Sequence, residues 1–102
     1  GFNANYPLAK GTAWGGYREA LKHALARIVA YQPDFLVVSL GVDTFEDDPI
    51  SHFQLKGDDF RRLGEQLAAA GLPTLFVMEG GYLVDDIGVN VANTLQGFEQ
   101  GA

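Results

Sequence analysis

Two short, predominantly apolar runs, at 35–42 and 74–78, constrain the fold of this chain most strongly. Runs of this length without regular polar alternation are typical of strands that are covered on both faces of a parallel sheet. Each run is followed by a turn with chemically useful residues: Asp43 follows the first run, and Gly80, Gly81 and Tyr82 follow the second. Because open α/β sheets bind ligands at the carboxyl ends of their strands, we expect a functional site where these turns meet.

The remainder of the chain has helical spacing. A first helix ends at Gln32-Pro33, a second begins with Asp58 as a candidate N-cap and stops at Gly71, and a third runs to the C-terminus. The apolar positions that define the three stripes are Tyr17, Leu21, Leu25, Ile28 and Val29, then Phe60, Leu63 and Leu67, then Ile87, Val91, Leu95 and Phe98. We predict one α/β unit over residues 1–102, with about three strands alternating with three helices.

Length, net charge and cysteine content exclude several classes of protein. The chain has 102 residues, 47% of them hydrophobic, which favours one small globular domain. The formal charge of −6, without a Lys/Arg cluster, argues against nucleic acid as a partner. The absence of cysteine excludes thiolate zinc sites, and no apolar stretch approaches the roughly 20 residues of a membrane span. We therefore expect a cytoplasmic protein, and the start at Gly1 without a methionine favours a processed terminus or an excised segment.

Two residues are the strongest site candidates, and each has a structural alternative. The carboxylate of Asp43 can bind a metal ion at a strand end, or it can stabilise an Asx-type turn. The hydroxyl of Tyr82, presented by the flexible Gly80-Gly81 turn, can donate to a developing oxyanion, or its ring can pack on the following helix. The nearby acidic run Glu46, Asp47 and Asp48 is typical of a solvated turn.

Other reactive residues give weaker signals. The Gly-Gly turn could cradle a phosphate, but neither a P-loop lysine nor the spaced glycines of a dinucleotide site accompany it. His23 is expected to face solvent on the first helix, and His52 could join Asp43 only in an incomplete metal shell. Ser39 lies inside a predicted strand and Ser51 has no base nearby in the sequence, so a covalent mechanism has no support.

Four segments in order, GFNANYPL at 1–8, VSLGVD at 38–43, Asp48-Pro49 and EGGY at 79–82, resemble the C-terminal part of the histone deacetylase family. The likeness is greatest to its bacterial acetylpolyamine amidohydrolase and class II-like branch. The resemblance implies the three-layer arginase-deacetylase fold with a parallel sheet, and a Zn²⁺ ion held by two aspartates and one histidine. By resemblance, Asp43 is a zinc ligand, Tyr82 polarises the acetyl carbonyl, and Gly80 and Gly81 line the substrate pocket.

The family's paired catalytic histidines and its Asp-x-His zinc segment have no counterpart in this sequence. The resemblance therefore implies a segment of a zinc-dependent deacetylase that hydrolyses an acetylated amine or acetyl-lysine to acetate and an amine, with little activity in isolation. Missing neighbouring strands would leave a sheet edge or a helix face exposed, which favours a homo-oligomer. The alternative is a noncatalytic oligomerisation or binding module derived from a truncated deacetylase.

Overall fold

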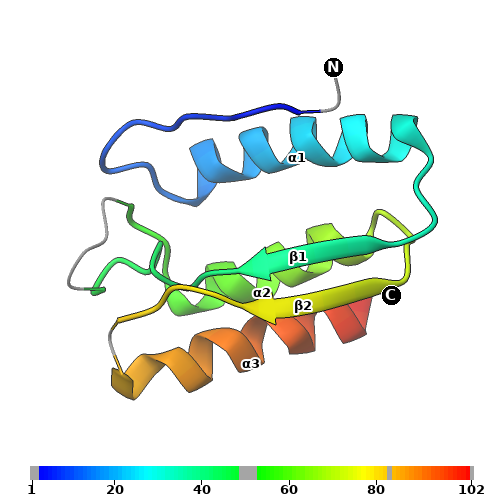
Figure 1. Ribbon diagram of the computed structural model, residues 1–102. Helices are drawn as coiled ribbons and strands as arrows, with labels where there is room; N and C mark the ends of the chain where they lie inside the picture. The colour runs from blue at the N-terminus through cyan, green and yellow to red at the C-terminus, as the bar shows by residue number, and fades with distance from the viewer. Residues whose placement is uncertain (1–2, 49–52, 83, 102) are drawn as a thin grey trace.

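A computed structural model describes residues 3–48, 53–82 and 84–101 of the chain. It contains three helices and two strands in the order helix, strand, helix, strand, helix (Figure 1). The elements are α1 (Trp14–Tyr31), β1 (Leu36–Leu40), α2 (Gly57–Ala68), β2 (Thr74–Met78) and α3 (Val84–Gly101). All three predicted helices and both apolar runs therefore appear as the expected type of element.

The two strands form a parallel pair, and α2 is the helix that connects them. Leu36 lies opposite Thr74 and Leu40 opposite Met78, so the two carboxyl ends are level with each other. The prediction of about three strands is wrong for the described residues, which contain two. Residues 3–8 form no strand and run beside α1 (Figure 1), and among the described residues the sheet consists of β1 and β2 alone.

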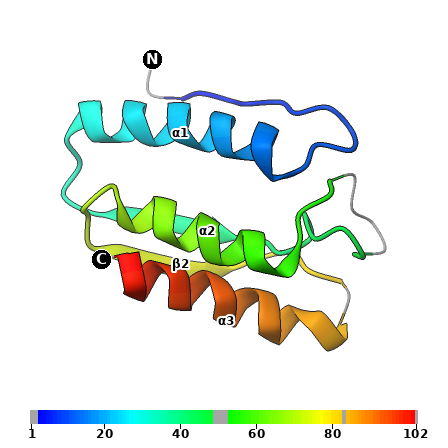
Figure 2. The ribbon, with the colours of Figure 1, turned by 180° about the vertical axis from the view of Figure 1, so that it is seen from behind.

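Helices α2 and α3 pack against each other and cover one face of the sheet (Figure 2). Leu36, Val38 and Phe76 project from the strands into this layer, where the ring of Phe76 meets that of Phe98 edge-on at 5.3 Å between centroids. The buried hydrophobic core comprises Leu25, Leu40, Val42, Phe45, Leu55, Phe60, Leu63 and Leu67. The core thus joins α2 to the sheet and to the loop after β1, and Leu25 adds α1 to it.

Two glycines allow the close approach of α2 and α3. A Cβ atom on Gly64 would overlap the carbonyl oxygen of Thr94, and one on Gly97 would overlap the carbonyl oxygen of Arg61. Because both obstacles are backbone atoms, a side chain could be accommodated only if the helices moved apart. This contact is therefore specified by the lack of a side chain at positions 64 and 97.

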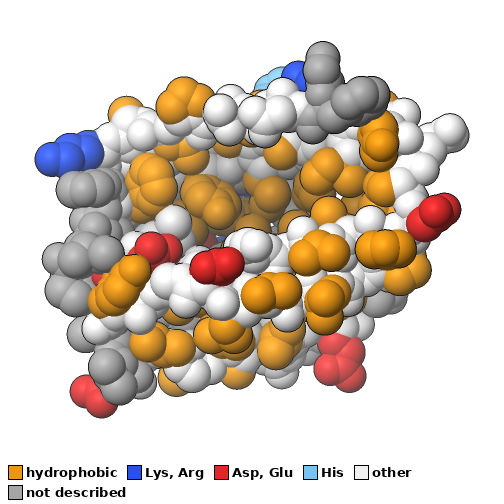
Figure 3. All heavy atoms as spheres, in the orientation of Figure 1, with side chains coloured by type: hydrophobic (Ala, Val, Ile, Leu, Met, Phe, Trp, Pro, Cys, Tyr) orange, Lys and Arg blue, Asp and Glu red, His pale blue; other side chains and the backbone are white. Residues whose placement is uncertain are grey.

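The opposite face of the sheet is open. Val37, Leu75 and Val77 project from it with large exposed fractions, 60% for Leu75. Figure 3 shows hydrophobic side chains gathered over the strands and in the hollow between β1 and α1. The prediction that both strands are covered on both faces is wrong within the described part of the chain, because its helix pair lies on one face only.

Helix boundaries mostly follow the predicted signals. Gln32 adopts the left-handed conformation (φ 59°) and its N–H donates to the carbonyl of Val29 at 3.0 Å, which ends α1 as expected. Asp58 is not the N-cap of α2. The cap is Lys56, because the carboxylate of Asp59 accepts the Lys56 N–H at 2.9 Å and thereby fixes the start of the helix one residue before Asp58.

Two residues of the predicted apolar helix stripes are not buried. Val29 on α1 and Leu95 on α3 were expected on buried faces, but they are 49% and 44% exposed. In the described chain, no further element packs over these positions. None of the helices in this part of the chain has the combined length and apolar character that a membrane-crossing segment requires.

Candidate functional site

The hydrogen-bonded ladder between the strands extends past their carboxyl ends. The N–H of Glu79 donates to the carbonyl of Leu40, and the N–H of Val42 donates to the carbonyl of Gly80, both at 2.8 Å. These bonds hold the segment after β1 beside the segment after β2. The structure therefore brings Asp43 and the Gly80-Gly81-Tyr82 turn together, as the strand-end pattern predicts.

The half-buried carboxylate of Asp43 packs directly on glycine backbone. A Cβ atom on Gly80 would lie 2.6 Å from Oδ2 of Asp43, and one on Gly41 would lie 2.9 Å from Oδ1. Any larger residue at either position would displace the carboxylate. The two glycines consequently leave room for an acidic group at the junction of the strand ends.

The second turn also depends on glycine. Gly81 has a φ of 153°, and a Cβ atom there would lie 2.7 Å from Cγ2 of the buried Val42. The backbone can therefore pass close to the core and then turn outward. Tyr82, the next residue, is 50% exposed, so part of its side chain faces solvent. Its role as a hydroxyl donor, against that of a ring packed on the following helix, stays a prediction.

Tyr17 of α1 lies near Asp43 at this end of the molecule. Burial, and secondarily the negative charge of Asp43, raise the pKa of the Tyr17 hydroxyl. The Tyr17 ring stacks on Trp14 at 6.2 Å and meets Phe53 edge-on at 6.5 Å between centroids. Sequence reasoning places Tyr17 only in the apolar stripe of a helix, because nothing local indicates its proximity to Asp43.

Asp48 differs most from expectation. The prediction of a solvated acidic turn is wrong for this residue, which is only 6% exposed. Its Oδ2 accepts the backbone N–H of Tyr82 at 2.7 Å, and this bond replaces part of the hydration that the buried carboxylate lacks. Asp47 is exposed as predicted, and the half-buried Glu46 forms an ion pair with Lys56 at 3.3 Å.

The described residues offer only part of a metal-binding set. In segments 3–48, 53–82 and 84–101, no three His, Cys, Asp or Glu side chains form a group that could hold a metal ion. His23 is exposed on α1 as predicted, and His52 and Ser51 lie outside the described residues. The position of Asp43 between two glycines fits one carboxylate ligand, but the remaining ligands would have to come from elsewhere.

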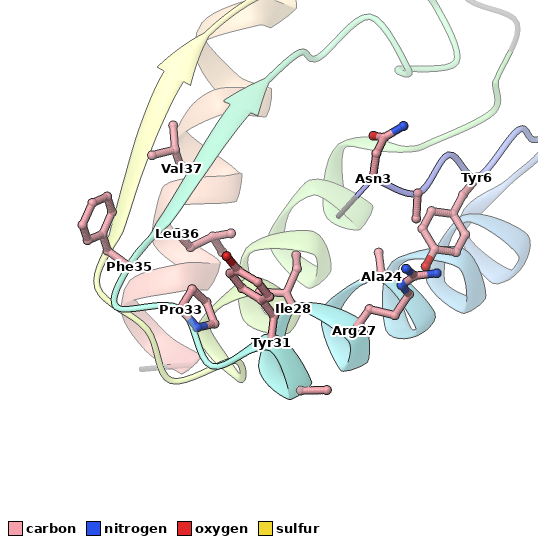
Figure 4. Close-up of a pocket in the computed structure, with 12 residues that line it drawn as sticks. Asn3, Tyr6, Ala24, Arg27, Ile28, Tyr31, Pro33, Phe35, Leu36 and Val37 are labelled. Carbon is pink, nitrogen blue, oxygen red and sulfur yellow. The ribbon is translucent and has the colours of Figure 1, made fainter. Parts of the chain in front are cut away.

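A large hollow lies away from these turns. It has a volume of about 700 Å³ and separates the C-terminal part of α1 from the start of β1, with Ile28 and Tyr31 on one side and Phe35 and Val37 on the other (Figure 4). Its lining is mainly apolar. Because Asp43 follows the opposite end of β1, this hollow is separate from the strand-end site.

The fold and the paired strand-end turns define a segment of an arginase-deacetylase-type α/β domain. A crystal structure of acetylpolyamine aminohydrolase from Burkholderia pseudomallei superimposes with a TM-score of 0.94 at 36% identity, covering 98% of this chain and 29% of the other. The pattern of the histone deacetylase domain matches residues 1–98, and the chain belongs to that family. The fold class and the family resemblance predicted from sequence are thereby confirmed.

Curated relatives point to one branch of the family. Acetylpolyamine amidohydrolase 1 of Pseudomonas aeruginosa is 56% identical over 102 residues, all of this chain and 30% of the relative. Acetylpolyamine amidohydrolase 2 of the same organism is 57% identical over 99 residues, 97% of this chain and 29% of the relative. The chain thus spans about 30% of the length of these relatives.

Proposed function

We propose that this chain is the C-terminal segment of a zinc-dependent deacetylase that hydrolyses N-acetyl amides to acetate and an amine. Acetylated polyamines are the preferred substrate class, with acetyl-lysine as the second. The observation that carries the proposal is the junction of Asp43 with the Gly80-Gly81-Tyr82 turn in a chain that is 56% identical to an acetylpolyamine amidohydrolase. A cytoplasmic location, and the absence of nucleic-acid and membrane partners, remain predictions from the sequence.

Each residue has a proposed role that suits its surroundings. Asp43 provides one carboxylate ligand for zinc, and Gly80 and Gly81 line the substrate pocket, where their lack of side chains permits close approach. The hydroxyl of the half-exposed Tyr82 donates a hydrogen bond to the acetyl oxygen as negative charge develops there. When bound, zinc would supply Lewis-acid polarisation and an activated water.

A chimera tests this function. The corresponding segment of the Pseudomonas aeruginosa amidohydrolase 1 is replaced by this chain, and hydrolysis of an acetylated polyamine is measured. Tyr82→Phe should lower kcat by about 10²–10³-fold, the usual effect of losing one oxyanion donor. Tyr31→Phe, at the opposite end of the sheet, is the matched control and should leave kcat unchanged. A folded, zinc-loaded chimera that stays active with Tyr82→Phe would refute the role of Tyr82.

The isolated chain should bind little zinc. One carboxylate without the other ligands is a weak site, so elemental analysis after dialysis should give a zinc content near zero. Asp43→Ala is the control. About one zinc per chain that is lost in Asp43→Ala would instead mean that association or His52 completes a site.

We also propose that the isolated chain associates with a second copy through the open face of the sheet. The face carries exposed Val37, Leu75 and Val77, and each strand has an edge that pairs with no other described strand. Light scattering should show a dimer or larger assembly, and Leu75→Lys should shift it towards monomer. Ala69→Lys, at the exposed end of α2, is the control, and a monodisperse monomer at high concentration would contradict the proposal.

The open face also supports a second candidate, a noncatalytic oligomerisation or binding module. A chimera that folds and holds zinc but hydrolyses no acetylated amine would favour this candidate. The reading frame upstream of Gly1 separates the two independently, because an in-frame Asp-x-His and a histidine pair would restore the enzyme's missing groups.

A further inference from the structure

Asp48 has no part in the proposed hydrolysis, yet its carboxylate is buried. A carboxylate removed from water is destabilised unless hydrogen bonds replace its hydration. Oδ2 of Asp48 accepts the backbone N–H of Tyr82 at 2.7 Å, across 34 residues of sequence. Bonds of this kind, from an amide to an ionised acceptor, are short and stronger than neutral ones. Asp48 therefore joins the loop after β1 to the turn after β2.

The Asp48 end of this link is firmly anchored. The N–H of Asp48 donates to the carbonyl of Phe45 at 3.1 Å. Phe45 is itself buried, packs on the fully buried Phe60 at 6.3 Å between ring centroids, and bridges to Leu55. The carboxylate thus projects from a segment that is fixed to the hydrophobic core.

The Tyr82 end depends on that link. Its ring is half-exposed, so packing of the side chain does little to fix its direction. The residue before it is Gly81, which has the widest backbone freedom of any residue type. The hydrogen bond to Asp48 therefore restrains the backbone atom from which the direction of the Tyr82 side chain follows.

We infer that Asp48 is a positioning residue that sets the place of the Tyr82 hydroxyl relative to Asp43. Asp43 and Asp48 lie on the same loop, so a bond from Asp48 to the turn fixes the turn against the loop that carries the candidate ligand. The inference rests on the proposed function, because it concerns the geometry in which Tyr82 acts. A displacement of about 1 Å in such a group is enough to lower a rate about 100-fold.

The link itself is tested on the 102-residue chain by hydrogen exchange of the Tyr82 amide, measured by NMR. Asp48→Ala should accelerate exchange about tenfold or more, and Asp48→Asn, which keeps an acceptor oxygen of the same shape, should have a smaller effect. Asp47→Ala removes the same charge from the exposed neighbour and should change nothing. The Val42 amide, held by Gly80, reports whether the fold is intact. Unchanged Tyr82 exchange in Asp48→Ala overturns the inference.

The consequence for catalysis is tested in the active chimera by a double-mutant cycle. Asp48→Ala should lower kcat about 10- to 100-fold with KM nearly unchanged, and Asp48→Asn should restore much of the loss. In a Tyr82→Phe background, Asp48→Ala should cost little more, because both changes remove the same contribution. Full additivity would overturn the positioning role. If Tyr82→Phe alone keeps full activity, the proposed function fails, whereas the amide exchange still decides whether Asp48 holds the turn.

Discussion

The two faces of the sheet have similar apolar side chains but opposite surroundings. Leu36, Val38 and Phe76 are packed under α2 and α3, whereas Val37 and Leu75, their neighbours in sequence, lie open. The comparison separates two properties of the chain. The covered face provides the burial that stabilises the described chain, and the open face carries apolar surface that no described residue covers.

The largest expected difference in stability between the two faces is that between replacing Phe60 and replacing Phe35. Phe60 is fully buried on the covered side, and Phe35 is 64% exposed at the hollow. Phe60→Ala should lower the free energy of unfolding by about 3–5 kcal/mol. Phe35→Ala should change it by no more than about 0.5 kcal/mol. Urea unfolding followed by circular dichroism checks both, and equal losses would mean that the hollow is filled in solution.

A smaller effect is expected from glycines within α3. Gly97 touches the α2 backbone, whereas a Cβ on the exposed Gly88 would meet no atom within 4 Å. Gly97→Ala should destabilise the chain by about 1–3 kcal/mol by forcing the helices apart. Gly88→Ala should stabilise it by up to about 1 kcal/mol through helix propensity. Thermal unfolding of both variants decides the matter: a neutral Gly97→Ala would show that the helix contact adjusts without cost.

The smallest effect concerns Tyr17 and is confined to alkaline solution. Because burial and Asp43 raise its pKa in the folded state, its contribution to stability is complete below the unfolded pKa of about 10 and is lost as pH rises through the folded pKa. Tyr17→Phe should make the alkaline decline in stability shallower, measured by urea unfolding between pH 9 and 11. Asp43→Asn should reduce the decline only in part, because burial is the larger cause. An identical decline in all three proteins would contradict this account.

Sequence periodicity predicts the elements well where one chain supplies both partners of a contact. The Phe60, Leu63 and Leu67 stripe faces the core as expected, since α3 and the sheet lie against it. The same pattern fails for Val29, because an apolar residue at helical spacing does not reveal whether its partner belongs to the described chain. For the same reason, the apolar run at 35–42 indicates two covered faces where the described chain provides one.

The sequence predicts those residues of the candidate site that directly follow a strand, but not those that reach it through long-range contacts. Asp43 and Tyr82 stand out because each follows a strand, and the parallel register brings strand ends together. Apart from its place in the Asp48-Pro49 segment of the resemblance, Asp48 has the same charge and the same loop position as Asp47, and its hydrogen bond to a residue 34 positions away leaves no local sign in the sequence. The nearness of Tyr17 to Asp43 likewise depends on how α1 lies against the core.

The continued ladder beyond the strands has a consequence for how the chain can change length. Between Leu40 and Asp43 lie only Gly41 and Val42, and the bonds from Glu79 to Leu40 and from Val42 to Gly80 hold the backbone on either side of Gly41. Side chains alternate in direction along extended backbone, so one inserted or deleted residue would turn the carboxylate to the other side. A substitution in this stretch can shift the Asp43 carboxylate by a small amount, whereas an insertion or deletion of one residue would reverse its direction.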